Sequence, residues 1–471
     1  MLPSSDTIDD GAAELVRALT YNESLQQLDL RDNLLNEEEQ DAIMEEVAAL
    51  PRSVAVLVKS SQRPRPAAAP HPRHKPVGQH HSQEAGGLAG RKISPAPHGA
   101  FPPIDGKDEV IAFDSNVDNI GGQLQEATYA TPSHRPSRHN DDMVSYKDRA
   151  LATSAPAGTF VDGHDHGVVP THTAHLNSDE LDTICQALEE NDGSIVELDL
   201  ADRGLGDTGI DVLSGPICQS HTLRILNLKN NNMTYDGVST LASHMRSTDE
   251  GDGNGEPSPF LVHVLEINIG WNDVLDRGIV SLSMSLREAV ELRRLFINNA
   301  ALADEATAAL SDMLKCIRVE QLHLRHNSVG SDGAALLSEA LNDDESMQTL
   351  LLGWNDIGVT GTEFICDSLR RNQTLRLLDI DGNDLGSDGA AAVSLALRDN
   401  TSLSSIWLAS NNIGDLGIDS LSDSLTFNST LLTLDLESNG ITAEGGALLA
   451  VALRHNSTLE NLWLGSNSIG A

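Results

Sequence analysis

Aromatic residues and cysteines are scarce in this chain of 471 residues, and it contains no long apolar run. Phe, Tyr and Trp together make up 3% of the sequence, and the four cysteines form no Cys-x-x-Cys pair. We expect these cysteines to act as small buried apolar residues in a reducing compartment. No segment approaches the roughly 20 apolar residues of a membrane span, and the N-terminus has no apolar signal core. These features predict a soluble, cytoplasmic protein.

Basic residues are also few. The chain has 31 Lys and Arg against 70 Asp and Glu, and a net charge of −39. Residues 175–471 carry 16 basic and 45 acidic groups, whereas residues 51–174 are nearly neutral. Nucleic acids and anionic membranes bind to clustered Lys and Arg side chains. We therefore expect neither as a partner.

Motifs of catalysis and of metal binding are missing as well. The sequence has no Gly-x-Ser-x-Gly, no His-Glu-x-x-His and no phosphate-loop Gly-Lys-Ser/Thr. The acidic segment 249–256 resembles a calcium loop, but its twelfth position is Leu261 instead of Glu. His164 and His166 flank an aspartate without a preorganised shell of ligands. We predict a protein that is not an enzyme and has no metal or cofactor.

What the sequence does contain is a repeat. From Leu375 the pattern reads Leu-x-x-Leu-x-Ile-x-x-Asn-x-Leu-Gly, and it starts again at Leu403, Leu431 and Leu459. A fixed period of about 28 residues is typical of stacked repeats. Earlier repeats keep this spacing to within one residue, except for one longer step. The landmark Asn position is occupied in order by Arg203, Asn231, Asn272, Ala300, Asn327, Asn355, Asn383, Asn411, Asn439 and Asn467, and the longer step separates the second from the third.

Each repeat is expected to form a short strand, a tight turn and a helix. The Leu-x-Leu segment alternates between two faces, as a strand does, and the landmark Asn can satisfy backbone groups of the turn. We expect Asp332 and Asp388 to cap the helices that follow. A helix is wider than a strand, so stacked units curve with the sheet inside. The fold class predicted is α/β: a horseshoe solenoid with a parallel concave sheet and convex helices, plus a long disordered segment.

This pattern resembles the ribonuclease-inhibitor type of leucine-rich repeat, which NOD-like receptors also contain. The resemblance covers Leu176 to Ala471. It implies an α/β horseshoe that binds other proteins, and it implies no reaction. No nucleotide-binding domain precedes the repeats in this sequence. Arg203 and Ala300 depart from the pattern because they replace the landmark Asn.

Three regions are expected along the chain. Residues 1–58 form an orphan repeat-like unit, which we expect to dock on the array or to be marginal alone. Residues 59–174 form a disordered linker, because 14 of the 18 prolines lie between Pro51 and Pro170. Residues 175–471 form an array of about ten repeats, the last one incomplete. The array stops at Ala471 without a polar cap, so we expect an exposed strand edge there, left by truncation or covered by a partner.

A recurring Asn-x-Ser/Thr triplet follows the same period. Its members are Asn372, Asn400, Asn428 and Asn456. We interpret them as structural, since Asn at a helix C-terminus tolerates the left-handed conformation. Without a secretory signal, we do not expect glycosylation.

The candidate binding site is the row of residues between the two strand leucines, which faces the concave surface. Neighbours in this row lie roughly 4.8 Å apart. Phe296, His323 and Leu351 should therefore form one patch, with Trp407 two strands further on. The row reads Asp199, Asn227, Asn268, Phe296, His323, Leu351, Asp379, Trp407, Asp435 and Trp463.

The other two tryptophans, Trp271 and Trp354, directly precede a landmark Asn on the same rim, and Arg325 adds a positive charge near His323. Exposed aromatic residues in a concave patch are typical anchors of a protein interface. The alternative is that some tryptophans lie flat across neighbouring strands as packing. Acidic members of this surface favour a partner with basic flanks; they are Asp199, Asp379, Asp381, Asp435 and Glu437.

The sequence thus predicts a non-catalytic scaffold that binds a protein partner on the concave face of the array. One alternative is a GTPase-activating protein of the Ran activator type, which uses a similar horseshoe. Another is a structural subunit of a ciliary or cytoskeletal assembly. The oligomeric state is left open.

Overall fold

The computed structural model describes residues 11–50, 52–58, 176–191, 193, 195–246 and 258–470, which all belong to one compact unit. The predicted linker 59–174, the acidic segment 249–256 and the histidines at 164 and 166 lie outside the described residues.

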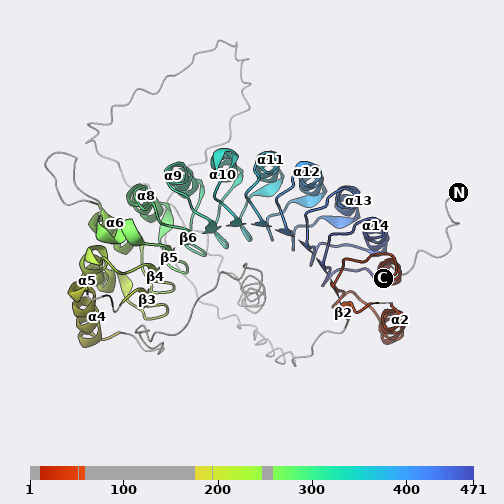
Figure 1. The fold of residues 1–471 in the computed structure, drawn as a ribbon, viewed down its shortest axis with the longest axis horizontal. Coiled ribbons are helices and arrows are strands. Elements are labelled where there is room, and N and C mark those ends of the chain that lie inside the picture. The colour runs from red at the N-terminus through yellow and green to blue at the C-terminus, as the bar shows by residue number, and fades with distance from the viewer. Residues whose placement is uncertain are drawn as a thin grey trace, which may run out of the picture. The chain divides into compact units, whose positions relative to one another are not determined.

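The described residues contain one parallel sheet of twelve strands, each three residues long (Figure 1). The order across the sheet is β2-β1-β12-β11-β10-β9-β8-β7-β6-β5-β4-β3. The strands are β1 Gln27–Asp29, β2 Ala55–Leu57, β3 Glu197–Asp199, β4 Ile225–Asn227, β5 Glu266–Asn268, β6 Arg294–Phe296, β7 Gln321–His323, β8 Thr349–Leu351, β9 Leu377–Asp379, β10 Ser405–Trp407, β11 Thr433–Asp435 and β12 Asn461–Trp463.

Helices α8 to α14 cover one side of this sheet and the strands form the inner side, as the sequence predicts (Figure 1). The predicted fold class is confirmed. The helices are α1 Gly11–Ala18, α2 Glu37–Ala48, α4 Ser178–Glu190, α5 Gly206–Gln219, α6 Tyr235–Met245, α7 Pro259–His263, α8 Leu275–Leu286, α9 Asp304–Leu314, α10 Ser331–Asp343, α11 Gly358–Leu369, α12 Gly386–Asp399, α13 Gly414–Leu425 and α14 Ala443–Leu453.

One continuous apolar core runs between the sheet and the helices. In each repeat the leucines or isoleucines at the strand point into it and are fully buried, as Leu434 and Leu436 are. Isoleucine after the landmark Asn and two leucines of the helix close the layer, for example Ile441, Leu449 and Leu453. Because each repeat buries its apolar face only against its neighbours, the stacking itself stabilises the array.

The landmark Asn side chains form a ladder along the turns. Asn439 donates from Nδ2 to the carbonyl oxygen of Leu408 in the preceding repeat at 2.9 Å, and its Oδ1 accepts from the amide of Asn411 at 2.9 Å. The same kind of bond recurs at the other landmark Asn residues, as the donation from Asn467 to Leu436 shows. Asn is needed there because one side chain must both donate and accept between two buried turns.

A second ladder corrects our interpretation of the Asn-x-Ser/Thr triplets. Asn400 ends α12 with φ −77°, which is not left-handed. Its buried side chain donates to the carbonyl oxygen of Leu369 in the preceding repeat at 2.7 Å and accepts from the amide of Leu403 at 2.7 Å. The role is structural, as expected, but it consists of a hydrogen bond between repeats.

The expected helix caps are also wrong. Neither α10 nor α12 has a side-chain cap hydrogen bond, although Asp332 and Asp388 lie in their first turns. At the start of α14 the first amides are satisfied by its own N-cap Thr442 and by an aspartate of the preceding repeat. Asp415 accepts from the amides of Thr442 and Gly445, at 2.9 and 3.1 Å, where α14 begins.

The N-terminal unit continues the sheet at its C-terminal end. Strand β1 pairs with β12 in parallel register, with Leu28 opposite Leu462, and β2 pairs with β1. Strand β2 and its position at the edge were not predicted from the sequence. The edge of β12 is therefore paired, and our expectation of an exposed strand edge there is wrong.

Candidate protein-binding surface

The candidate residues of the central strands meet as expected. Phe296 ends β6 and His323 ends β7, and register places them opposite each other. Their ring centroids lie 4.4 Å apart at 80°, an edge-to-face contact, and both side chains are half-buried. Burial, with a smaller contribution from the positive charge of Arg325, lowers the pKa of His323 to about 3. This imidazole is therefore neutral at physiological pH and presents an aromatic ring.

Four other predicted anchors are buried, whereas we expected exposed side chains. Leu351, Trp407 and Trp463 retain 1%, 2% and 9% of their accessible surface, and Arg325 retains 4%. The guanidinium carbon of Arg325 lies 5.6 Å from the ring centroid of Trp407. For Trp407 and Trp463 the structure favours the alternative in which tryptophan serves as packing.

Two of the acidic residues expected to attract a basic partner are paired internally. Arg325 Nε lies 2.8 Å from Asp379 Oδ2, and Arg325 Nη2 lies 3.1 Å from Asp381 Oδ2. All three side chains are buried. Paired charges inside the surface attract a basic partner less than free carboxylates do, so the structure weakens this argument for basic flanks.

The residue before each landmark position adopts the left-handed conformation throughout the array. In these ten repeats its φ lies between +50° and +61°. Glycine adopts this conformation without steric cost, and Asn, Asp and His adopt it more readily than other residues do. The ten residues are Asp202, Asn230, Trp271, Asn299, His326, Trp354, Gly382, Ser410, Ser438 and Ser466.

Three central repeats place a large ring at this costly position: Trp271, His326 and Trp354. The ring centroids of His326 and Trp354 lie 6.0 Å apart and the planes are stacked at 10°, while Trp271 and His326 lie 6.4 Å apart at 49°. All three are half-buried. The ammonium nitrogen of Lys229 lies 5.9 Å from the Trp271 ring centroid. We call Trp271, His326 and Trp354 the aromatic row.

The backbone holds this conformation whatever side chain is present. The amides of Trp271, His326 and Trp354 donate to carbonyl oxygens of the next repeat at 2.7, 2.9 and 2.6 Å. A left-handed bulky residue costs about 1–3 kcal/mol and persists only where its surroundings impose it. Gly382 makes room for the last ring, because a Cβ there would lie 2.7 Å from Trp354 Cε3.

Sequence reasoning found both tryptophans of the aromatic row but not what unites them with His326. A signal was present. In the other repeats this position holds only Asp, Asn, Ser or Gly, small residues typical of turns, so three large rings stand out.

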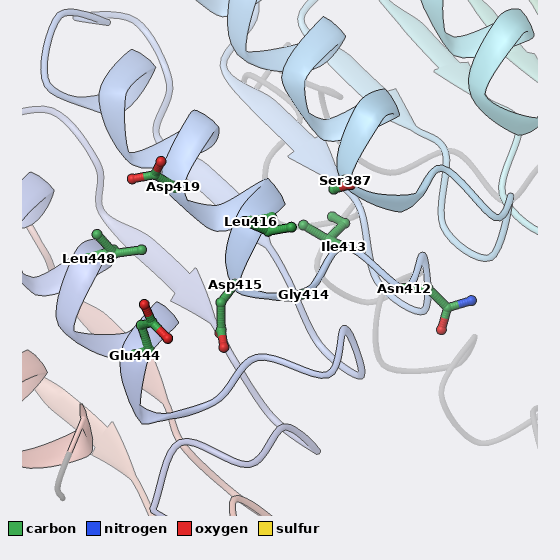
Figure 2. A pocket seen from close by; sticks show the side chains of 9 residues that line it. All are labelled: Ser387, Asn412, Ile413, Gly414, Asp415, Leu416, Asp419, Glu444 and Leu448. Atoms are coloured by element: carbon green, nitrogen blue, oxygen red, sulfur yellow. The ribbon is translucent and has the colours of Figure 1, made fainter. Parts of the chain in front are cut away.

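A shallow pocket of about 540 Å³ lies at the N-terminal ends of α13 and α14. Figure 2 shows the side chain of Leu416 directed toward Ile413 and Ser387, while Glu444 and Leu448 lie on α14, on the other side of α13. The carboxylate of Asp415 already accepts hydrogen bonds from the amides of Thr442 and Gly445 at the start of α14. Asp207 accepts hydrogen bonds from the amides of Thr234 and Gly237 in the same way, so this arrangement of an aspartate recurs where repeats stack. We therefore assign no ligand to the pocket.

Within the described residues, no group of three or more His, Cys, Asp or Glu side chains is placed to hold a metal ion. Among the same residues, no helix combines the length and apolar character needed to cross a membrane.

Comparison with known proteins agrees with the fold. A family model described as Leucine Rich repeat matches residues 219–242, 315–338, 371–394, 399–422 and 427–450. A protein from Mus musculus, "NACHT, LRR and PYD domains-containing protein 14", is 28% identical over 187 residues, which are 36% of this chain and 19% of that protein. This chain thus spans a small part of that relative's length.

A solved structure, "Leiomodin-1 Actin-Binding Site 2 (ABS2)", aligns with 32% of this chain and 87% of its own, at 17% identity and a TM-score of 0.28. The period, the parallel sheet and the five matched repeats agree with each other. The chain is a leucine-rich-repeat protein, and part of it is similar to a relative that also contains NACHT and LRR domains.

Proposed function

We propose that this protein is a non-catalytic scaffold that binds a protein partner through the aromatic row and the adjacent Phe296–His323 pair. Leucine-rich repeats suggest a protein interaction module. The single observation that supports this location is the aromatic row in the left-handed position. Three of four consecutive repeats place a large ring where the backbone disfavours it. We infer that these rings are retained because they bind a partner.

The chemistry of this surface indicates what it binds. Phe296 and His323 end β6 and β7, and the aromatic row follows β5, β7 and β8, so the five rings span four consecutive strands of the sheet. Half-buried rings held by the backbone lose little conformational entropy when a partner covers them. A partner that inserts apolar or aromatic side chains between these rings fits best.

A substitution at Trp271 separates binding from packing. Asn occupies the same position in the repeats on both sides, as Asn230 and Asn299. Trp271→Asn therefore keeps a residue that tolerates φ +61° and removes only the ring. We expect thermal stability to stay equal or rise, because asparagine reduces the cost of about 1–3 kcal/mol for a left-handed tryptophan. Binding should fall by at least about tenfold, since tryptophans dominate protein interfaces.

The experiment is an affinity pull-down with wild type, Trp271→Asn and the matched control Ser438→Asn, followed by quantitative mass spectrometry. Ser438 occupies the same left-handed position near β11, far along the sheet from the aromatic row. Proteins lost from the Trp271→Asn eluate but retained by Ser438→Asn are partners of the row. If both variants retain the same proteins as wild type, or both lose them, the assigned site is wrong.

A further inference from the structure

The repeat that contains β12 is divided between two segments that lie far apart in the sequence. Its strand β12 and its landmark Asn467 come from the C-terminal end, but the helix beside α14 is α1, from the N-terminal end (Figure 1). The contact is close. A Cβ on Gly11 would lie 2.6 Å from the carbonyl oxygen of Ala443, so α1 packs against α14 only with glycine at its first residue.

This junction uses the same bonds as those between consecutive repeats. Asn33 Nδ2 donates to the carbonyl oxygen of Leu464 at 2.8 Å, as landmark residues do throughout the array. Asn22 Nδ2 donates to the carbonyl oxygens of Leu453 and Asn456 at 2.9 and 2.8 Å, and so extends the second Asn ladder.

The sequence follows the same register. If Ala471 were joined directly to Asp10, Asn33 would follow Asn467 at the same spacing at which Asn467 follows Asn439. The apolar residues agree, because those of the N-terminal unit are fully buried at the junction, as Leu15 and Leu28 are. The unit of residues 11–58 is therefore a terminal repeat that fits the C-terminal end of the array by shape, hydrogen bonds and burial.

The segment that connects the unit to the array is long enough for the unit to dock either on its own array or on that of a second copy. Strands β2 and β3 lie at opposite edges of the sheet, separated by eleven strand spacings of about 4.8 Å each. The segment 59–175, which connects them, has 117 residues and could extend to roughly 390 Å at about 3.3 Å per residue. Its length does not require that the unit dock on its own array.

We propose that this junction is an exchangeable interface, in which residues 11–58 of one copy dock on the β12–α14 end of a second copy and the exchange is reciprocal. The contacts in the exchanged dimer are those of the closed monomer, so the two differ mainly in connectivity. Each copy completes the other's last repeat. An array end without α1 and β1 exposes a strand edge and apolar side chains, and an identical unit covers both.

Concentration then decides between the two forms. A tethered unit competes at an effective concentration that is on the order of 1 mM for short flexible linkers and lower for long ones. Refolding at about 10 µM should give closed monomers, and refolding near about 1 mM should give exchanged dimers. Two copies of different mass, refolded together at both concentrations, are analysed by native mass spectrometry. A mixed dimer whose fraction rises with concentration is the expected result.

A permuted chain and a pair of Asn→Ala variants test whether the dimer forms through this junction. In a permuted chain that runs from residue 176 to 471 and then from residue 10 to 58, the unit is continuous with the array, so this chain should stay monomeric at every concentration. Asn22→Ala weakens the junction and should accelerate exchange between preformed dimers about tenfold or more, since two buried carbonyl groups lose a donor. Asn372→Ala removes the equivalent side chain inside the array and should leave the exchange rate unchanged.

Two results would overturn the proposal. One is the absence of a mixed dimer from chains refolded near the upper concentration. The other is a permuted chain that dimerises as much as the natural one, because the association would then use another surface.

Discussion

The landmark ladder allows a quantitative prediction at Asn411. Its side chain is fully buried and connects neighbouring turns. Nδ2 donates to the carbonyl oxygens of Ile380 at 2.9 Å and Leu408 at 3.0 Å, and Oδ1 accepts from the amide of Asn383 at 2.8 Å. Replacement by alanine removes all of these bonds without adding volume.

The consequences differ between these groups. The carbonyl oxygen of Leu408 keeps a donor, because Asn439 Nδ2 also reaches it at 2.9 Å. The carbonyl of Ile380 and the amide of Asn383 instead lose the partner that Asn411 supplied. A buried polar group left without a partner costs about 1–3 kcal/mol, so Asn411→Ala should lower the free energy of unfolding by about 2–6 kcal/mol.

Urea denaturation followed by circular dichroism measures this loss, and hydrogen exchange at the amide of Asn383 locates it. Asp419→Ala serves as the control, because Asp419 is exposed on α13 in the same repeat and such substitutions usually stay within about 0.5 kcal/mol. A loss below about 1 kcal/mol at Asn411, or unchanged exchange at Asn383, would refute the view that this ladder holds the turns together.

Two further predictions concern titratable groups. Because the pKa of His323 is lowered to about 3, the unfolded chain binds a proton near pH 6.5 that the folded protein does not, so the stability it contributes is complete above pH 6.5 and falls as the pH drops toward 3. Urea titrations at pH 7 and pH 5 should therefore show a smaller pH dependence for His323→Gln than for wild type. Burial raises the pKa of Cys218 to about 12 and also raises that of Cys366, so a thiol reagent should modify exposed Cys316 quickly and these two only in denaturant.

The fold could be predicted from the sequence because each repeat has the same pattern of strand, turn and helix residues. Strand β10, for example, follows from Leu403, Ile406 and Leu408, which occupy the same places in the fixed period of the array, and Gly414 marks the turn into α13. These signals are local, and the repetition confirms each of them several times. Errors arose where the partner of a side chain belongs to another repeat, as with the capping of α14 by Asp415.

The candidate site was only partly predictable, because exposure depends on what surrounds a residue and not on its position in a strand. Leu351 and Phe296 occupy equivalent positions, yet the first is buried and the second half-buried. A position in the pattern says which way a side chain points. It does not say whether a neighbour covers that side chain, as Arg325, held by two carboxylates, lies over the Trp407 ring.

Residue choice at a constrained backbone position is the more informative signal for function in a repeat protein. Every repeat faces the same conformational requirement before its landmark residue, and we propose that a large ring at this position is maintained for the side chain itself. Trp271, His326 and Trp354 depart from it in nearby repeats and contact one another in sequence. Tryptophan at the strand position, as in Trp407, meets no such penalty, and there packing alone is a sufficient reason for the residue.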